Sequence, residues 1–291
     1  MSKLASAGIL LLVLAAAPAG ALTWVRDLTH SFNNPGFIGV QGTSVYVSDW
    51  GNNCLKEFST AGNFIRQWGS LGSSNGRMNQ PWGVAVDSTG HVYVADYGNN
   101  RIEKFSGTGA FGKTWNSFGA MAFNGPEGVA VDSANHIYVA DCGSGRIEKF
   151  TSGGGYITSW TGTGPGALSA PKTLAVDKSG HVFVADYGDN TIKEYDSSGG
   201  FLRVWGGYGA GAGKFNGPLG VVVGSSGNVY VADYLNNRLE MFSSNGTFLN
   251  AWGKEGSGRV QFRYPEGLAM DSNGLLYVAD TANNRVEVLK P

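Results

Sequence analysis

The sequence has few charged residues and no long run of either sign. Charged side chains make up 15% of its 291 residues, and 21 Lys and Arg nearly balance 22 Asp and Glu. A protein that binds nucleic acid through its phosphates needs a concentrated positive surface. The composition therefore argues against a general nucleic-acid-binding role, and we expect no nucleic acid among the partners.

Cysteine is also scarce, since Cys54 and Cys142 are the only two. They fall at different positions of the repeated unit described below, so a disulfide between them is not expected, although the sequence does not exclude it. No GxSxG turn, Walker loop or Cys–His pair rises above what chance supplies. The sequence therefore gives no positive sign of catalysis, and it predicts no cofactor.

Charge is also scarce in the first 22 residues, where Lys3 is the only charged side chain. After Lys3, the stretch Leu4–Leu22 is uncharged, with small residues at Ala19 and Ala21. A basic residue, an apolar stretch and a small-x-small site form, in that order, a secretory signal peptide. We predict a signal peptide over residues 1–21, cleaved after Ala21 or Ala19, and a secreted or extracytoplasmic protein without a stable membrane span. An uncleaved anchor is the alternative, because the stretch is just long enough to cross a bilayer.

What the sequence does contain is repetition. The clearest copies are GVAVDSTGHVYVADYGNNRIEKF from Gly83, GVAVDSANHIYVADCGSGRIEKF from Gly128 and TLAVDKSGHVFVADYGDNTIKEY from Thr173. Each of six copies opens at a proline, 45 to 47 residues after the one before: Pro35, Pro81, Pro126, Pro171, Pro218 and Pro265. Repeats of this length are typical of β-propeller blades.

Each copy has the pattern of four short strands. In the second copy an apolar run from Gly83 leads through the turn DSTG into HVYVAD, and the strands RIEKF and FGKTW follow. Gly90 and Gly109 stand where the hairpin turns need a positive φ. A four-stranded sheet that is apolar on both faces cannot stand alone, so the sheets must pack around an axis. We predict an all-β fold, a six-bladed β-propeller of four-stranded antiparallel blades.

The sixth copy stops after its third strand, and the N-terminal segment can complete it. Trp24 precedes Pro35 by 11 residues, as Trp115 precedes Pro126. We therefore expect Leu22–Leu28 to form the outer strand of blade six and to close the ring, which removes exposed sheet edges. The predicted propeller covers 22–291, with blades at 35–80, 81–125, 126–170, 171–217, 218–264 and 265–291 plus 22–34. Tryptophans end the other outer strands and should pack at the rim: Trp68, Trp115, Trp160, Trp205 and Trp252.

The order of proline, glycine, apolar-Ala-apolar-Asp, then Gly, apolar-Tyr-Val-Ala-Asp and Asn-Arg-apolar resembles the NHL repeat over nearly all of the mature chain. The resemblance implies a six-bladed propeller. The family includes RNA-binding and protein-binding regulators, extracytoplasmic sensor domains and an amidating lyase with metal-binding histidines between the second and third strands. The comparable residues here are Asn53, Asn100, Gly145, Asn190, Asn237 and Asn284. We therefore do not expect that zinc site.

Aspartates end the second strand of every blade and should ring one face: Asp49, Asp96, Asp141, Asp186, Asp233 and Asp280. One carboxylate in each blade indicates a structural role, in which Asp accepts backbone N–H groups, and a catalytic or calcium-binding ring is the alternative. Arginines that begin third strands should pair with these aspartates. His91, His136 and His181 repeat as well, but equivalent positions diverge from the axis and cannot meet at one zinc ion. We predict no metal site and place these histidines on the opposite face.

Two positions do not repeat between copies. The residue after the ring aspartate is Trp50, Tyr97, Cys142, Tyr187, Tyr234 or Thr281, and the residue after the opening proline is Gly36, Trp82, Glu127, Lys172, Leu219 or Glu266. Both sets should lie at one mouth of the central channel, where aromatic and charged side chains suit sugars, peptides or small organic ligands. The predicted ligand-binding residues are Trp50, Tyr97, Tyr187, Tyr234, Trp82, Glu127, Lys172 and Glu266. The alternative is that they only fill the mouth.

Three functions remain open at this point. The first is a secreted, non-catalytic and monomeric scaffold that binds a protein, peptide or glycan on this loop face. The second is a propeller enzyme, a lyase or hydrolase, with a divalent metal held by Glu127, Glu266 and nearby aspartates. The third is an RNA-binding or ubiquitin-pathway scaffold, which requires that the N-terminus not be a signal. Fold alone does not choose among them.

Overall fold

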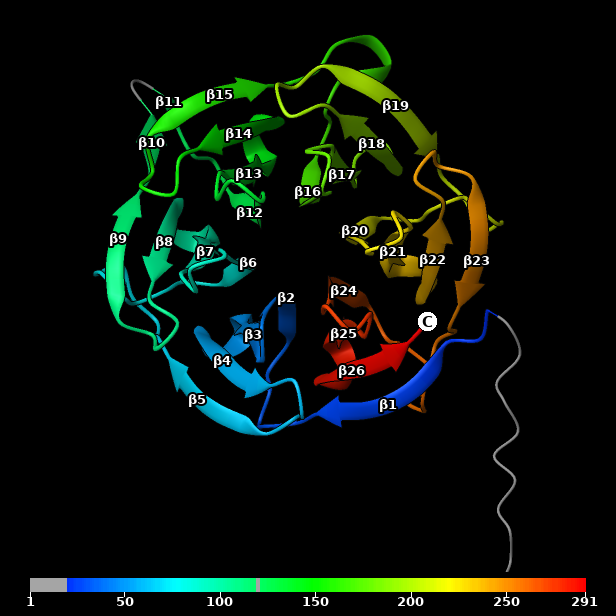
Figure 1. Ribbon diagram of the computed structural model, residues 1–291, viewed down its shortest axis with the longest axis horizontal. Coiled ribbons are helices and arrows are strands. Elements are labelled where there is room, and N and C mark those ends of the chain that lie inside the picture. Colours follow the sequence, from blue (N-terminus) through cyan, green and yellow to red (C-terminus); the bar gives the residue numbers. More distant parts are fainter. Residues whose placement is uncertain (1–19, 119–120) are drawn as a thin grey trace, which may run out of the picture.

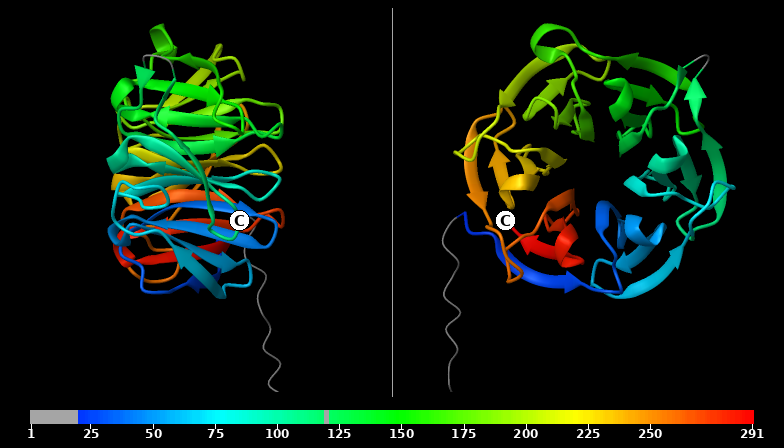
Figure 2. Two further views of the ribbon diagram at one scale, coloured as in Figure 1. Left: turned by 90° about the vertical axis from the view of Figure 1, so that its left-hand side faces the viewer. Right: turned by 180° about the vertical axis from the view of Figure 1, so that it is seen from behind.

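The fold is a closed ring of antiparallel sheets, seen down its axis in Figure 1 and from its edge in Figure 2. A computed structural model describes residues 20–118 and 121–291. The predicted signal segment therefore lies outside the described residues, except for Gly20 and Ala21. In the described part of the chain, no helix is long and apolar enough to span a membrane.

Five of the six blades are continuous in sequence. Blade one is β2 (Pro35–Gln41), β3 (Ser44–Asp49), β4 (Cys54–Ser59) and β5 (Phe64–Trp68). Blade two is β6 (Pro81–Val86), β7 (Val92–Asp96), β8 (Arg101–Phe105) and β9 (Phe111–Trp115). Blade three is β12 (Pro126–Val131), β13 (Ile137–Asp141), β14 (Arg146–Phe150) and β15 (Tyr156–Trp160). Blade four is β16 (Pro171–Val176), β17 (Val182–Asp186), β18 (Thr191–Tyr195) and β19 (Phe201–Gly206). Blade five is β20 (Pro218–Val223), β21 (Val229–Asp233), β22 (Arg238–Phe242) and β23 (Phe248–Trp252).

The sixth blade joins the two ends of the chain. Strands β24 (Pro265–Met270), β25 (Leu276–Asp280) and β26 (Arg285–Lys290) are followed at the outer edge by β1 (Thr23–Leu28). Strand β1 pairs with β26 in antiparallel register, and Figure 1 shows the first strand beside the last. The predicted six-bladed fold and its closure by the N-terminal strand are both confirmed.

The position of Trp24 within that strand differs from the expected one. In blade two, Trp115 pairs with Ile102 near the start of the third strand. In blade six, Leu28 takes the equivalent place opposite Val286, whereas Trp24 pairs with Leu289 at the other end. Pairing along the whole of β26 sets the register, and the connection from Leu28 to Pro35 is correspondingly short. Equal intervals to the proline therefore did not mean equivalent places.

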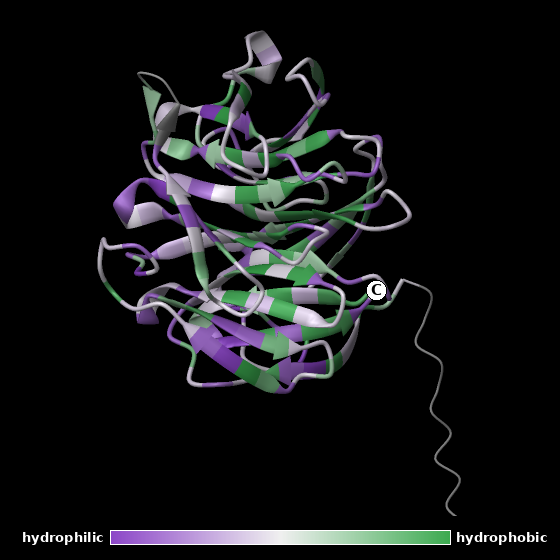
Figure 3. Cartoon of the chain, turned by 60° about the vertical axis from the view of Figure 1, so that its left-hand side comes forward, coloured by the Kyte–Doolittle hydropathy of each residue, from purple (hydrophilic) through white to green (hydrophobic). Residues whose placement is uncertain are grey.

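The hydrophobic core lies between neighbouring blades. One cluster joins Tyr93 and Ile102 of blade two to Ile137, Val139 and Phe150 of blade three, and all five are 0–1% exposed. Full burial of such side chains contributes roughly 1.5–3 kcal/mol each. Hydrophobic and hydrophilic bands alternate along the strands in Figure 3, as expected for sheets stacked around an axis. Each blade is thus stabilised by its neighbours, and the ring depends on all six.

The tryptophans at the outer rim pack against the turn of the next blade. The indole of Trp68 lies against the turn of the next blade at Gly109, where an added Cβ would come within 2.8 Å of the ring. Gly109 also has a φ of +85°, which favours glycine for a second, independent reason. The same contact recurs between Trp115 and Gly154 and between Trp205 and Gly246. The predicted packing role of these tryptophans is therefore visible in the structure.

Candidate functional site

The loop face is built from the ends of second strands and the starts of first strands. Asp96 pairs with Pro81 across β7 and β6, and the same pairing recurs in the other blades. The residues that follow each proline and each aspartate therefore lie near one another on this face. Short 3-10 turns follow most of the aspartates, as in Tyr97–Asn99 and Tyr234–Asn236.

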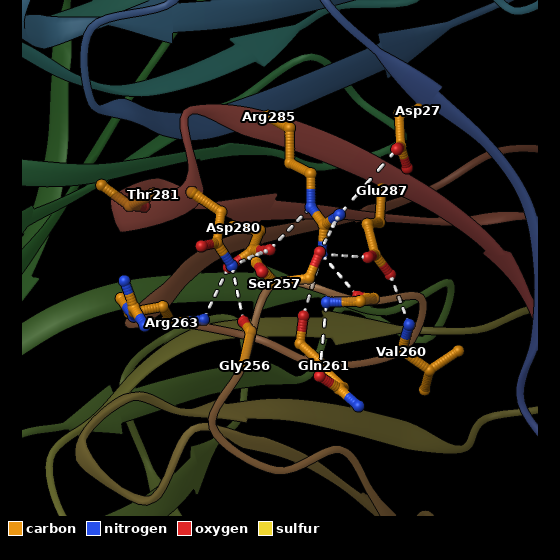
Figure 4. Close-up of polar contacts among 12 residues, drawn as sticks. Asp27, Gly256, Ser257, Val260, Gln261, Arg263, Asp280, Thr281, Arg285 and Glu287 are labelled. Atoms are coloured by element: carbon orange, nitrogen blue, oxygen red, sulfur yellow. Dashed lines mark hydrogen bonds and ion pairs between the residues drawn. The ribbon is translucent and has the colours of Figure 1, made fainter.

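Each ring aspartate is fully buried and organises its loop, and Figure 4 shows the arrangement in blade six. Asp280 accepts a hydrogen bond from the backbone N–H of Arg263 at 2.7 Å and pairs with the Arg285 guanidinium at 2.8 Å. Arg285 also donates to the carbonyls of Ser257, Gly258 and Gln261 at 2.8–2.9 Å. The aspartate and arginine thereby hold the connection between blades, and this geometry supports the structural interpretation of the ring.

A buried glutamate completes this cluster in four blades: Glu103, Glu148, Glu240 and Glu287. Burial, only partly offset by the neighbouring arginine, raises the pKa of each of these carboxyls to about 7. Blades one and four lack the arginine, and there Lys56 and Lys193 stand in the place of the glutamate. They pair with Asp49 and Asp186 at 2.6 Å. A cation therefore faces the aspartate in every blade.

The asparagines at the lyase-like positions also have a structural role. Asn53, Asn100, Asn190, Asn237 and Asn284 adopt left-handed backbone conformations with φ of 51–58°. Their side-chain oxygens accept the backbone N–H just before the next opening proline, as Asn100 does from Gly125 at 2.7 Å. They fasten one blade to the next, a function that the sequence reasoning did not foresee.

The repeating histidines lie at the first hairpin turns, on the face opposite the aspartate ring. His91 contacts Asp87 at 3.1 Å and His136 contacts Asp132 at 2.9 Å through ring nitrogens. His181 lies 2.9 Å from Glu194. Within residues 20–118 and 121–291, no group of three or more His, Cys, Asp or Glu side chains is placed to hold a metal ion.

Two aromatic rings among the predicted site residues lie beside the ammonium group of Lys172. The Lys172 Nζ lies 5.6 Å from the ring centre of Trp82 and 5.6 Å from that of Tyr187. Trp82 in turn packs against Tyr97, with 5.6 Å between ring centres. These side chains belong to blades two and four, so Lys172 reaches across the mouth of the channel toward a different blade.

Lys172 also forms a buried ion pair. Its Nζ lies 2.6 Å from a Glu127 Oε1 that is almost inaccessible to solvent. Burial raises the pKa of Glu127 despite this lysine. Burial opposes the charged form of Lys172, but Glu127 outweighs that effect and raises its pKa. Cys142 lies beside both, and burial raises the pKa of its thiol to about 11, so it is no ready nucleophile.

Glu266, on blade six, is 5% exposed. Burial, followed by the charge of Glu127, raises its pKa to about 8, while Lys172 opposes the shift. Burial, and after it the charge of Glu266, raises the pKa of Tyr234. The Tyr234 ring also packs on Tyr264 at 5.1 Å. Glu127, Lys172 and Glu266 therefore form one electrostatic group, although they come from three blades.

Trp50 and Glu266 lie close to Gly36, the residue after the opening proline of blade one. A Cβ on Gly36 would lie 3.1 Å from Trp50 Cδ1 and 3.5 Å from Glu266 Oε2. Deeper in the channel, the six first strands enclose an apolar cavity of about 200 Å³, lined for example by Ile38, Val84 and Leu174. The strands β2, β6, β12, β16, β20 and β24 surround this space in Figure 1. None of the eight predicted mouth residues lines this cavity, which lies toward the ends of the first strands that are away from the opening prolines.

The structure thus places all eight predicted residues on one face, and side-chain contacts link most of them. Sequence reasoning missed Cys142, Phe37 and Tyr264 as members of the cluster. Phe37 packs on Trp82 at 5.6 Å between ring centres. Cys142 and Phe37 were detectable, because each departs from the residue type that neighbouring copies carry at its position.

Comparisons with known proteins agree with the fold. A family model described as NHL repeat matches residues 78–105, 123–150, 215–242 and 262–289. A search of curated proteins found no match. Among solved structures, a gluconolactonase from Xanthomonas campestris is similar with a TM-score of 0.68 and 13% identity, covering 94% of this chain and 98% of that one.

Two further structures are similar at comparable levels. Virginiamycin B lyase from Staphylococcus aureus has a TM-score of 0.63 and 15% identity, covering 93% of this chain and 99% of that one. An auxiliary nutrient binding protein from Bacteroides thetaiotaomicron has a TM-score of 0.66 and 12% identity, covering 89% and 69%. At these identities the likeness concerns the fold, which serves enzymes and binding proteins alike.

Proposed function

This chain belongs to the NHL repeat family of six-bladed propellers, and we propose that it is a non-catalytic scaffold that binds a protein, peptide or glycan ligand on its loop face. One observation carries the proposal. The side chains that do not repeat between blades converge at the channel mouth, where Lys172 bridges Trp82 and Tyr187 and pairs with Glu127. Most side chains that the fold needs recur in most blades, so the converging exceptions are available for recognition.

The chemistry of the mouth suits recognition. Half-buried aromatic rings offer apolar area at small entropic cost, and a few fixed charges orient a ligand. The repeating arginines are already engaged by aspartates and loop carbonyls, as Arg101 is by Asp96 and the carbonyls of Ser73 and Arg77. That engagement disfavours the RNA-binding alternative, which needs free basic groups.

The ligand face is tested by an array of glycans, peptides and cell-envelope components probed with the whole chain. Replacement of Tyr187 and Tyr234 by alanine should abolish the binding found on the array. A His91→Ala variant, altered on the opposite face, serves as the matched control and should bind normally. Unchanged binding by the tyrosine variants would show that the assigned face is wrong.

We propose an extracytoplasmic location, supported by the apolar N-terminal segment with its small-residue site. N-terminal sequencing of protein recovered from the native host tests it. A chain that begins at Leu22 or Gly20 would support export, because these are the first residues left by cleavage after Ala21 or Ala19. An intact N-terminus in the cytoplasm would contradict it and revive the intracellular scaffold.

A propeller enzyme is the second candidate, because two buried carboxyls, Glu127 and Glu266, interact at the channel mouth. A lyase and a gluconolactonase also share the fold. A divalent metal needs more ligands than these two carboxylates supply. Elemental analysis of the purified chain distinguishes the two functions: our proposal expects no stoichiometric calcium or zinc, and bound metal would favour the enzyme.

A further inference from the structure

The channel mouth holds more carboxyl groups than cationic groups. Two carboxyls, Glu127 and Glu266, interact there with a single ammonium group, that of Lys172. Lys172 is committed to Glu127 at 2.6 Å, which leaves Glu266 without a cation of its own. Because Glu266 is 5% exposed, water does not compensate its charge well.

Both carboxyls also keep an oxygen unused. The Oε2 atoms of Glu127 and Glu266 are buried and accept no hydrogen bond from the described residues. Buried polar atoms in native proteins are nearly always partnered, and an exception calls for an explanation. One explanation is a ligand that donates to these oxygens or neutralises them.

The surrounding rings are suited to a positive charge. The Lys172 ammonium already occupies a position 5.6 Å from Trp82 and 5.6 Å from Tyr187, within the range of cation–π attraction. On the side of Glu266, Trp50 Cδ1 and Glu266 Oε2 lie 3.1 Å and 3.5 Å from the position that a Cβ on Gly36 would take. The charge of Glu266 also contributes to the raised pKa of Tyr234. The mouth thus combines a buried carboxyl that has a free oxygen with aromatic side chains beside it.

We propose that the mouth binds an organic ammonium group, held by Glu266 with Glu127 and surrounded by Trp50, Tyr234 and the neighbouring rings. This chemistry rests on the proposed function and specifies its ligand as one that carries a substituted or primary amine. Lys172 stays paired with Glu127 and limits the site to one added positive charge.

An inorganic cation fits less well. Calcium takes six to eight oxygen ligands and magnesium a near-ideal octahedron, whereas this mouth offers two carboxylates among aromatic rings. Aromatic faces attract weakly hydrated organic cations without replacing their ligand shells. Recognition by rings and a carboxylate therefore favours an ammonium ion over a metal ion.

Binding should be coupled to the protonation of Glu266. The groups that interact with it are Glu127, Lys172, Thr281 and Tyr234, and its raised pKa of about 8 means that it is largely neutral at pH 7. A cation favours the ionised form, so its binding releases a proton below that pKa. Affinity should therefore rise as the pH rises toward about 8 and level off above it.

The experiment is calorimetric titration of the whole chain with choline and with the neutral isostere in which carbon replaces the nitrogen. Choline should bind at least roughly tenfold more tightly than the isostere. Its heat should vary with the ionisation enthalpy of the buffer at pH 7, which reports proton release. Equal binding of both compounds, or calcium binding in place of choline, would overturn the proposal.

Two variants at the site and one control sharpen the test. Glu266→Gln should weaken choline binding by roughly tenfold or more and remove the proton release. It should not lower the melting temperature at pH 7, because the carboxyl that it replaces is largely neutral there. Gly36→Leu places the side chain that blade five carries at Leu219 against Trp50 and Glu266, and it should block choline. Glu255→Gln changes a carboxyl whose side chain is 69% exposed and should bind choline normally. Normal choline binding by Glu266→Gln contradicts the proposal.

The same variants distinguish a failure of the ammonium site from a failure of the proposed binding function. If array ligands bind through Tyr187 and Tyr234 but are unaffected by Glu266→Gln, the ammonium site is wrong and the loop face remains the binding face. If replacement of Tyr187 and Tyr234 leaves binding on the array unchanged, the proposed function itself is wrong.

Discussion

At the scale of single residues, the fold depends on buried charges that are paired within each blade. Arg285 links Asp280, Glu287 and three loop carbonyls, with 13% of its side chain exposed. Truncation of a buried pair leaves an uncompensated charge, which typically costs 3–5 kcal/mol. The repeated ion pairs therefore add little net stability, but removing one partner of a pair destabilises the fold strongly.

We predict that Arg285→Ala lowers the free energy of unfolding by roughly 3 kcal/mol or more. Arg263→Ala is the matched control, because the Arg263 side chain is 48% exposed and its pair with Glu255 is 4.0 Å long. Exposed pairs contribute about 0–1 kcal/mol. Chemical denaturation of both variants measures the difference, and similar losses would contradict the role given to Arg285.

The glutamates of this cluster predict how stability depends on pH. Burial raises the pKa of Glu103, Glu148, Glu240 and Glu287 to about 7 from an ordinary 4.5. The folded chain therefore binds these protons more tightly than the unfolded chain, so the contribution is full below about pH 4.5 and is lost as the pH rises to about 7. The melting temperature should be higher near pH 5.5 than near pH 8.

Glu240→Gln should flatten this dependence, because the amide does not titrate. Thermal melts of the parent and the variant across the same pH range measure the effect. A melting temperature that rises from pH 5.5 to pH 8 in the parent would show that these carboxyls are ionised in the folded state.

At the scale of elements, turns and rim tryptophans join neighbouring blades. Gly109 and Gly90 have nearly the same φ, +85° and +86°, but only Gly109 lies against Trp68. Gly90→Ala should cost about 1 kcal/mol from backbone strain alone. Gly109→Ala should cost roughly 1–3 kcal/mol more, because its methyl group collides with the indole. Equal losses in denaturation would mean that the rim contact contributes little.

The closing strand makes a second prediction at this scale. A chain that begins at Leu22 keeps β1, and one that begins at His30 lacks it. Loss of β1 removes the fully buried Leu28 and exposes the edge of β26, so the melting temperature should fall by roughly 10 °C or more and aggregation should increase. Identical melting of the two chains would contradict closure by this strand.

The sequence predicted the strands because period-two alternation and turn glycines are local signals, repeated six times. It also predicted which segment closes the ring. The register of that segment was not predictable from the interval between Trp24 and Pro35, because pairing with β26 sets it. The pairing of Lys56 and Lys193 with ring aspartates was missed for a similar reason, since it depends on which face of the sheet each side chain takes.

At the scale of the whole molecule, six similar blades surround a channel whose mouth is lined by side chains that differ from blade to blade. The sequence indicated the eight mouth residues, because they depart from the repeat. It did not indicate that Lys172 reaches over Trp82 of another blade or that Glu127 and Glu266 share the charge of this one lysine. Such contacts cross the axis, and they depend on side-chain lengths and directions that no single copy of the repeat contains.

The central claim is that repeating residues maintain the fold whereas the exceptions at the mouth bind the ligand. Its most direct test is one variant in which Trp82, Glu127, Lys172 and Glu266 are all replaced by leucine, the residue at Leu219 in blade five. Apolar replacement of a whole buried ion pair is often neutral or stabilising. The variant should therefore keep the parent's cooperative melting and lose all binding found on the ligand array. Retained binding, or loss of the fold, would contradict the claim.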